Sequence, residues 1–163
     1  MCAVLANVLV NEEDMNKIRV TKEFHFEMAH ALWNYDGVCK HIHGHSYKLF
    51  VTIVGKPIQD PKDIKQGMVL DFSDLKKLVK GPIVDKLDHS LVLNKEAEDK
   101  IPDESNQMYS KVHIFDFQPT CENLVLYIVD KLKPTLPSEI ELYSVRLYET
   151  ASSFAEWYMV DNQ

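Results

Sequence analysis

Apolar and polar residues alternate from Ile18 to Met28, and this alternation constrains the fold more than any other feature of the chain. The even positions are apolar except at Lys22, and the odd positions are all polar or charged. A period of two residues is typical of a strand that buries one face, because successive side chains point to opposite faces of a sheet. We therefore expect a strand from Ile18 to about Ala29.

Three further strands are expected from composition and from the residues that end them. The first covers about 43–54, is rich in β-branched and aromatic residues, and stops at Gly55-Lys56-Pro57. The other two cover roughly 140–150 and 154–160. The sequence between them, Ala151-Ser152-Ser153, is typical of a connecting turn.

Two helices are expected between the second strand and the last two. The first has apolar residues at helical spacing after Ser73, which we take as its N-cap, and Pro82 is expected to kink or divide it. The second follows Pro119-Thr120, presents an apolar stripe, and ends at Pro134. The expected order is strand, strand, helix, helix, strand, strand. The long connection 91–118 contains one further candidate for a short strand, over 111–117.

The composition is that of a globular chain with room for one ordinary domain. The chain has 163 residues, of which 45% are hydrophobic and 26% charged, and we assign 15–163 to a single domain and 1–14 to an N-terminal extension of unknown role. The net charge of -7 disfavours nucleic acid and anionic membranes as general partners. The apolar N-terminus is too short for a membrane span and lacks the basic flank of a signal peptide. Three widely spaced cysteines fit a reducing, cytoplasmic setting.

The segment Cys39-Lys40-His41-Ile42-His43-Gly44-His45 is the strongest candidate for a functional site. Alternate side chains of a strand point the same way, so imidazoles two residues apart can converge on one ion. His30 ends the preceding strand and is an obvious third ligand. A single histidine would more often be solvated or hydrogen-bonded, but a His-x-His pair with a further histidine on the neighbouring strand favours a metal site. Zinc is favoured over iron because no carboxylate falls within this segment.

Three other features could take part in chemistry. Cys39 lies four residues before His43 and could be a fourth metal ligand, a small buried residue or a catalytic thiol. Asp88 and His89 are adjacent, and a carboxylate beside an imidazole can orient it for proton transfer. Glu149 shares the parity of the apolar residues on its strand, so it is expected to point inward, where a carboxylate needs a partner or a ligand. A salt bridge or a solvated strand end is the alternative for Glu149.

These motifs together resemble the 6-pyruvoyl-tetrahydropterin synthase / 6-carboxy-tetrahydropterin synthase family over most of residues 16–160. The resemblance consists of an ordered series of short motifs: Phe24-His25-Phe26-Glu27-Met28-Ala29-His30, Cys39, His43-Gly44-His45-Ser46-Tyr47, Gly67-Met68-Val69-Leu70-Asp71-Phe72, Leu87-Asp88-His89, Pro119-Thr120-Cys121-Glu122-Asn123 and Tyr148-Glu149-Thr150. The resemblance implies an α+β tunnelling fold (T-fold), with a four-stranded antiparallel sheet and two helices inserted between strands two and three. It also implies a homo-oligomeric barrel, usually a hexamer made of two trimers.

The resemblance also assigns roles to residues. The implied cofactor is a zinc ion held by His30, His43 and His45. Cys39 would be the general base, and Asp88 with His89 would form its proton relay.

The implied substrate is a small molecule, 7,8-dihydroneopterin triphosphate, whose pterin ring would be bound by Glu149. Backbone groups around Thr120 and Cys121 resemble the family's second contact to the ring. The Cys39-x-x-x-His43 spacing is similar to that of the 6-carboxy-tetrahydropterin synthases of queuosine biosynthesis, which release triphosphate and acetaldehyde. The alternatives are 6-pyruvoyl-tetrahydropterin synthase activity, which keeps the side chain, a sepiapterin-cleaving side activity, and a non-catalytic, zinc-stabilised pterin-binding module.

Two features depart from the family pattern. The connection 91–118 is longer than usual, so it is expected to cover the site or an interface. Cys121 stands where serine or alanine is common, which would bring a second thiol near the pocket.

Overall fold

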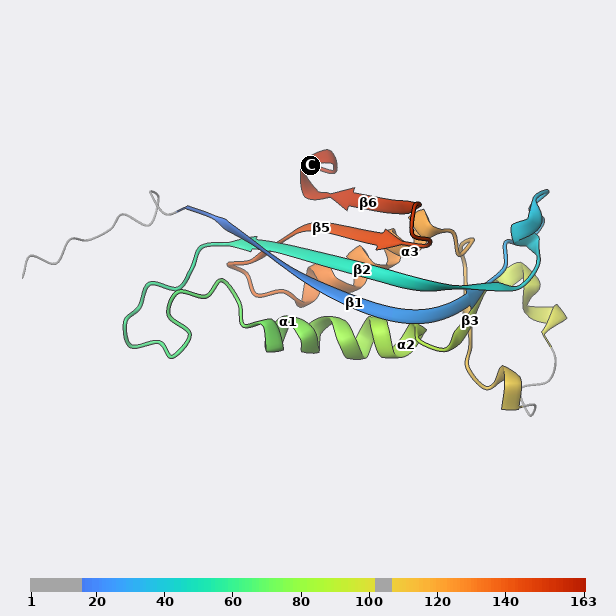
Figure 1. The fold of residues 1–163 in the computed structure, drawn as a ribbon, viewed down its shortest axis with the longest axis horizontal. Coiled ribbons are helices and arrows are strands. Elements are labelled where there is room, and N and C mark those ends of the chain that lie inside the picture. Colours follow the sequence, from blue (N-terminus) through green and yellow to red (C-terminus); the bar gives the residue numbers. More distant parts are fainter. Residues whose placement is uncertain (1–15, 102–106) are drawn as a thin grey trace, which may run out of the picture.

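The two alternating segments form a long antiparallel hairpin that is the centre of the fold (Figure 1). The computed structural model describes residues 16–101 and 107–163, so the expected extension 1–14 lies outside the described residues. Strand β1 (Ile18–His30) pairs along its whole length with β2 (His43–Gly55), from Ile18 opposite Gly55 to His30 opposite His43. This register places the ends that carry the histidines side by side.

The sheet has six strands in the order β4-β3-β1-β2-β5-β6. Strand β5 (Glu141–Tyr148) pairs antiparallel with β2, and β6 (Phe154–Tyr158) pairs antiparallel with β5. These four strands are the ones expected from the sequence.

The prediction of a four-stranded, fully antiparallel sheet was wrong, because the long connection adds two strands. Strand β3 (Ser90–Asn94) lies parallel to the end of β1, and β4 (Val112–Phe115) lies parallel to β3. Parallel neighbours need a long crossover between them, and the residues between Asn94 and Val112 supply it. The unusual length of 91–118 therefore widens the sheet beside the end of β1, while the short strand expected over 111–117 is confirmed as β4.

The first helical segment runs without a break from Phe72 to Leu87, although only its ends are α-helical. Helix α1 (Phe72–Val79) is followed by a π-helical turn (Lys80–Val84) and then by α2 (Asp85–Leu87). The wide turn contains Pro82, which cannot donate the next helical hydrogen bond, so α-helical geometry changes where the proline was expected to disturb it. The N-cap is Asp71, whose side chain accepts from the backbone N–H of Ser73 at 2.7 Å, and not Ser73 itself.

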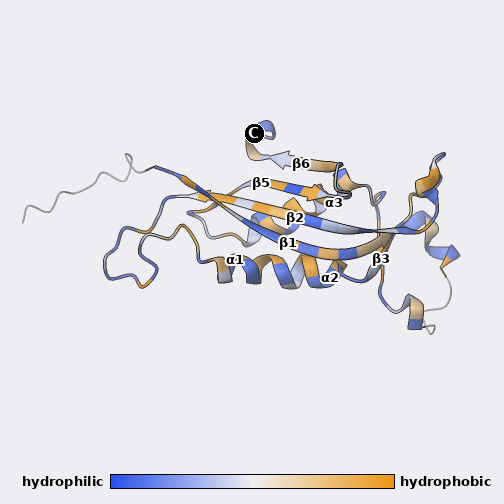
Figure 2. Cartoon of the chain, viewed as in Figure 1, coloured by the Kyte–Doolittle hydropathy of each residue, from blue (hydrophilic) through white to orange (hydrophobic). Residues whose placement is uncertain are grey.

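The second helix, α3 (Cys121–Leu132), begins where the sequence predicts. Thr120 is its N-cap, with Oγ1 accepting from the N–H of Asn123 at 3.3 Å. Its apolar stripe, which includes Leu124 and Ile128, is fully buried and joins one core cluster with residues of α1 and of the sheet. Figure 2 shows hydrophobic and hydrophilic residues alternating along β1 and β2. The helices therefore cover one face of the sheet, as the alternation requires.

Short 3₁₀ turns complete the described chain: Val38–Lys40, Lys95–Lys100, Gln107–Tyr109, Lys133–Thr135 and Met159–Asp161. Within the described residues, no helix combines the length and the apolar character needed to cross a bilayer.

Candidate active site

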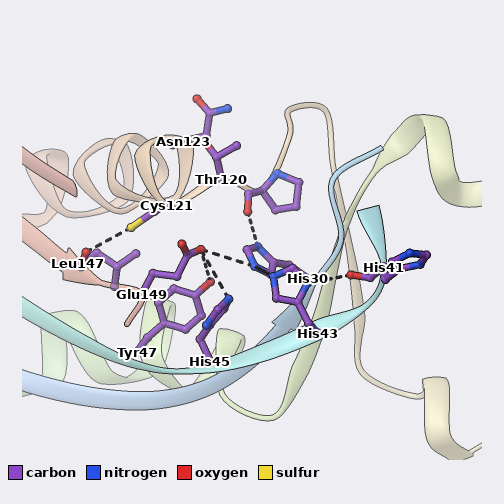
Figure 3. A network of polar contacts seen from close by, with 11 residues as sticks. His30, His41, His43, His45, Tyr47, Thr120, Cys121, Asn123, Leu147 and Glu149 are labelled. Atoms are coloured by element: carbon purple, nitrogen blue, oxygen red, sulfur yellow. Dashed lines mark hydrogen bonds and ion pairs between the residues drawn. The ribbon is translucent and has the colours of Figure 1, made fainter. Parts of the chain in front are cut away.

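Three histidines converge at the paired ends of β1 and β2 (Figure 3). His30 is opposite His43 in the register, and His45 is opposite Met28, so all three side chains lie on the helix-covered face. One ring nitrogen from each lies within 4.8 Å of those of the other two. The Nε2 atoms of His30 and His43 are 3.2 Å apart. The spacing of the sequence and the register of the hairpin thus build one cluster that could hold a metal ion.

Backbone carbonyls fix the tautomers of two of these imidazoles. His30 donates from Nδ1 to the carbonyl oxygen of Pro119 at 2.7 Å, and His43 donates from Nδ1 to that of His41 at 2.8 Å. A carbonyl oxygen can only accept, so in the neutral rings the proton is on Nδ1 and each Nε2 carries a lone pair. The two lone pairs face each other at hydrogen-bond distance without a proton between them. This arrangement fits metal ligands, which characteristically donate their second ring nitrogen to a carbonyl or carboxylate.

The burial of the cluster also fits a metal. His30 is only 2% exposed, and this burial lowers its pKa, against the raising effects of the Pro119 carbonyl and Glu149. The neutral form that coordinates metals is therefore favoured. Nε2 of His45 is buried and has no hydrogen-bond partner among the described residues. An orphaned nitrogen of this kind costs free energy unless a ligand satisfies it. The residues present thus fit a bound metal ion.

His41 does not join the cluster, although it shares the sequence segment. It precedes the first residue of β2, its side chain is exposed, and its ring lies apart from the other three in Figure 3. Only its backbone carbonyl takes part, through His43. The alternation of strand side chains therefore begins at His43.

Glu149 follows the last residue of β5 and points inward toward the histidines. Its Oε1 lies 3.6 Å from Nε2 of His30 and 4.0 Å from Nε2 of His45. The hydroxyl of Tyr47 donates to the same oxygen at 3.3 Å. Burial, and then the nearby Glu149, raises the pKa of Tyr47, so its phenol stays protonated and can donate. The site is thus a group of imidazoles with one carboxylate beside it.

This carboxylate corrects one step of the sequence analysis. The sequence favours zinc over iron because no carboxylate lies within the histidine segment, but the fold brings the carboxylate of Glu149 to the cluster from the end of another strand. The donor set still contains three imidazoles, which suits zinc. Tyr47 was missed, although it has the same parity as His43 and His45 and that parity could have revealed it.

The start of α3 lies against the cluster. The carbonyl of Pro119 that receives the His30 proton immediately precedes the N-cap residue Thr120. The Cys121 thiol is buried and donates to the carbonyl of Leu147 at 3.3 Å. Burial raises its pKa to about 12. The thiol is therefore protonated at neutral pH and points toward β5. The expected contact to a pterin ring then falls to the backbone around Thr120 and Cys121.

Asp88 and His89 follow the end of the first helical segment and lie beside Glu27 of β1. His89 Nδ1 is 3.0 Å from Oδ1 of Asp88, and the same Oδ1 accepts from the N–H of Glu27 at 2.9 Å. That backbone hydrogen bond is the main cause of the lowered pKa of Asp88, with smaller contributions from His89 and Lys111. The structure therefore brings the carboxylate and the imidazole into contact. Among the described residues, no hydrogen bond or ion pair joins this pair to the three clustered histidines.

Cys39 lies in the 3₁₀ turn of the β1–β2 connection and is half-buried. Its carbonyl accepts from the N–H of Leu32 at 2.9 Å. In the part of the chain that the structure describes, the group that could hold a metal ion contains three histidines and no cysteine. The alternative that Cys39 is a fourth ligand therefore has no support from the geometry.

Two cavities meet at Gly44, His45 and Ser46. One, of about 640 Å³, extends along Tyr148 and Glu149. The other, of about 530 Å³, is lined by Glu27, His89 and Lys111. His45 therefore lies where the carboxylate side of the site and the Asp88–His89 side come together.

Comparison with known proteins gives the same family as the motifs. A curated 6-carboxy-5,6,7,8-tetrahydropterin synthase from Haemophilus influenzae is 38% identical over 141 residues, which cover 85% of this chain and 97% of the relative. The protein of the same name from Aquifex aeolicus is 30% identical, with coverage of 86% and 98%.

Solved structures agree on the fold. The 6-pyruvoyl tetrahydropterin synthase of Caenorhabditis elegans superposes with a TM-score of 0.62 at 25% identity, covering 88% of this chain and 96% of that one. An uncharacterized protein from Wolinella succinogenes gives a TM-score of 0.72 at 23% identity, covering 88% and 99%. The model of the 6-pyruvoyl tetrahydropterin synthase family matches residues 19–159. The resemblance seen in the sequence motifs is confirmed, and this chain belongs to the 6-pyruvoyl tetrahydropterin synthase family.

Proposed function

We propose that this enzyme converts 7,8-dihydroneopterin triphosphate to 6-carboxy-5,6,7,8-tetrahydropterin, with release of triphosphate and acetaldehyde, as a step of queuosine biosynthesis. The observation that carries the proposal is the cluster of His30, His43 and His45 with the carboxylate of Glu149 beside it. Curated relatives with 30–38% identity are named for the same product. The Cys39-x-x-x-His43 spacing resembles that of the 6-carboxy-tetrahydropterin synthases, and this resemblance favours the carboxy product over the pyruvoyl one.

We infer that His30, His43 and His45 hold a zinc ion. When bound there, zinc would act as a Lewis acid that polarises oxygen atoms of the substrate side chain. The carbonyls of Pro119 and His41 hold two of the rings so that their lone pairs point into the cluster.

Glu149 is proposed to bind the pterin ring. The 2-amino group and N3–H of a pterin form a pair of donors that one carboxylate can accept together. Tyr47 donates to Oε1 and so holds the carboxylate in place. The adjoining cavity of about 640 Å³ falls within the range of small-molecule sites.

Cys39 is proposed as the general base, and Asp88 with His89 as the relay that moves protons while triphosphate leaves. The Asp88 carboxylate can stabilise a protonated His89, because the two groups are in contact. His89 also lines a cavity shared with His45.

The decisive experiment is a product assay with 7,8-dihydroneopterin triphosphate and the zinc-loaded protein. Acetaldehyde together with a carboxypterin supports the proposal. A pyruvoyl product indicates the alternative synthase activity, and tight pterin binding without turnover indicates a binding module. Either of these two outcomes would overturn the proposed reaction.

We further propose that the chain forms a homo-oligomer, a hexamer made of two trimers. Strands β4 and β6 are the two edges of the described sheet, and unpaired edge groups favour association with another edge. Closure of a barrel between subunits would pair them. Light scattering at micromolar concentration tests this: a mass near that of one 18.9 kDa chain contradicts the proposal.

A further inference from the structure

The turn that carries Asp88 and His89 has an unusual backbone. Helix α2 ends at Leu87, Asp88 is extended, and His89 has a φ of 54°. This left-handed conformation is uncommon for residues with a side chain and costs about 1 kcal/mol or more. Such a residue keeps its conformation only when its surroundings hold it there.

One side of the turn is held by β1. The N–H of His89 donates to the carbonyl of Glu27 at 2.6 Å, while the side chain of Asp88 accepts from the N–H of Glu27. These two bonds attach both residues to the same position of the central hairpin. The carbonyl groups in the last turn of a helix have no hydrogen-bond donors within the helix. The two bonds to Glu27 do not supply such donors, so other groups must.

The hydroxyl of Ser90 donates to the carbonyl of Leu87, and the connection that departs from the family pattern supplies partners for the other carbonyls. Lys111 donates from Nζ to the carbonyl of Asp85 at 2.8 Å and also to the carbonyl of Asp88. His113, two residues further along, donates from Nε2 to the carbonyl of Lys86 at 2.8 Å. A cation at the C-terminal end of a helix is also favoured by the helix dipole. Lys111 is anchored in turn, because its own carbonyl accepts from the N–H of Leu91 at 3.0 Å.

We propose that Lys111 is a positioning residue for the Asp88–His89 pair. This inference rests on the proposed function, in which that pair relays protons. Lys111 bonds to the backbone of Asp88 itself, whereas His113 bonds two residues earlier. Glu27 holds the turn on one side and Lys111 holds it on the other. The His89 imidazole is thereby kept against the Asp88 carboxylate. It also faces the cavity that Lys111 and His45 line.

The test compares Lys111→Met, Lys111→Arg and His113→Ala in the zinc-loaded enzyme. Lys111→Met keeps most of the side chain's length but removes both hydrogen bonds. We expect kcat to fall by about tenfold to a hundredfold, the scale of a small misplacement of reacting groups, with KM, pterin affinity and metal content unchanged. Lys111→Arg restores most of the kcat because a guanidinium can also donate to two carbonyls. His113→Ala is the matched control, which loses a helix-end hydrogen bond but keeps the kcat of the parent.

Hydrogen exchange provides a readout that does not depend on turnover. In Lys111→Met, the amides of 87–90 should exchange faster, while those of α1 keep the rate of the parent. A parent protein without turnover would refute the proposed function, and the exchange result would still decide whether Lys111 holds the turn. Unchanged kcat with unchanged exchange overturns the proposal. Equal losses of kcat in Lys111→Met and His113→Ala also overturn it, because they would mean a general loosening of the helix end.

Discussion

Single hydrogen bonds to backbone carbonyls determine the chemistry of the histidine cluster. Pro119 and His41 accept the Nδ1 protons of His30 and His43, and so leave both Nε2 atoms as acceptors. Both residues contribute only a backbone carbonyl, and neither side chain takes part. A search for chemically active side chains in the sequence would therefore miss both. The candidate metal site depends on the local path of the backbone as much as on the three imidazoles.

Metal content should separate His43 from His41, which lies only two residues away. We expect His43→Ala to lose most of its zinc, because a stable catalytic site needs at least three protein ligands. His41→Ala is the matched control: it removes an exposed ring but keeps the carbonyl that His43 uses, so about one zinc per chain should remain. Elemental analysis of both purified variants decides this, and equal metal loss would contradict the ligand assignment.

Glu149→Gln distinguishes a pterin-binding carboxylate from a metal-binding one. The amide would turn a donor toward the two donors of the ring and leave buried groups unpaired, at a cost of about 1–3 kcal/mol. That corresponds to roughly a 5- to 150-fold loss of pterin affinity, measurable by fluorescence titration, with unchanged zinc content. Loss of zinc with normal pterin affinity would instead assign the carboxylate to the metal.

Cys39→Ala tests the proposed general base. Zinc content and pterin binding should persist, because the candidate metal-binding group of the described residues does not include this thiol. Turnover should fall by about 10²–10⁴, the usual scale for the loss of a positioned acid–base group. Steady-state kinetics and metal analysis on one preparation suffice, and a zinc-free variant would make Cys39 a ligand.

At the scale of elements, the sequence predicts those parts of the fold that depend on local periodicity. The alternation from Ile18 defines β1 and its covered face, and the same parity argument brings Glu149 inward. Strand β3 could not be found this way, since Ser90–Asn94 is a short, mostly buried run without alternation and its parallel partner lies far away in the sequence. The first helix cap was misplaced by two residues because Asp71 and Ser73 are both good caps. The contacts of Lys111 depend on where β4 lies, which no local pattern shows.

Thr120 links the stability of α3 to the position of the site. Its hydroxyl caps the helix directly after the carbonyl that holds His30. Thr120→Ala should lower the free energy of unfolding by about 1 kcal/mol, the usual cost of an N-cap, whereas Thr120→Ser keeps the capping oxygen and should lose much less. Urea unfolding at one fixed protein concentration measures the difference. Equal stability of the two variants would show that the cap contributes nothing.

At the scale of the whole molecule, burial beside the site makes folding sensitive to alkaline pH. The Cys121 thiol packs between α3 and β5, and its burial raises its pKa from 9.0 to about 12. In the unfolded chain the thiol loses its proton near pH 9, while in the folded chain it keeps it. The unfolded state therefore binds fewer protons between these values, so the free energy of unfolding is unaffected below about pH 9 and falls as the pH rises above it.

Cys121→Ser removes this titration and keeps a hydroxyl that can donate to Leu147. Between pH 9 and 10.5 the parent should lose stability more steeply than the variant, by up to about 1.4 kcal/mol per pH unit. The buried Tyr47 titrates in the same direction in both proteins, and burial and Glu149, the two largest causes of its raised pKa, remain in the variant, so most of its effect cancels in the difference between the two slopes. Urea unfolding across this range, with protein and zinc concentrations fixed, gives both curves. Parallel curves would mean that Cys121 ionises as easily in the folded protein as in the unfolded chain, and that the contact between α3 and β5 is open to solvent.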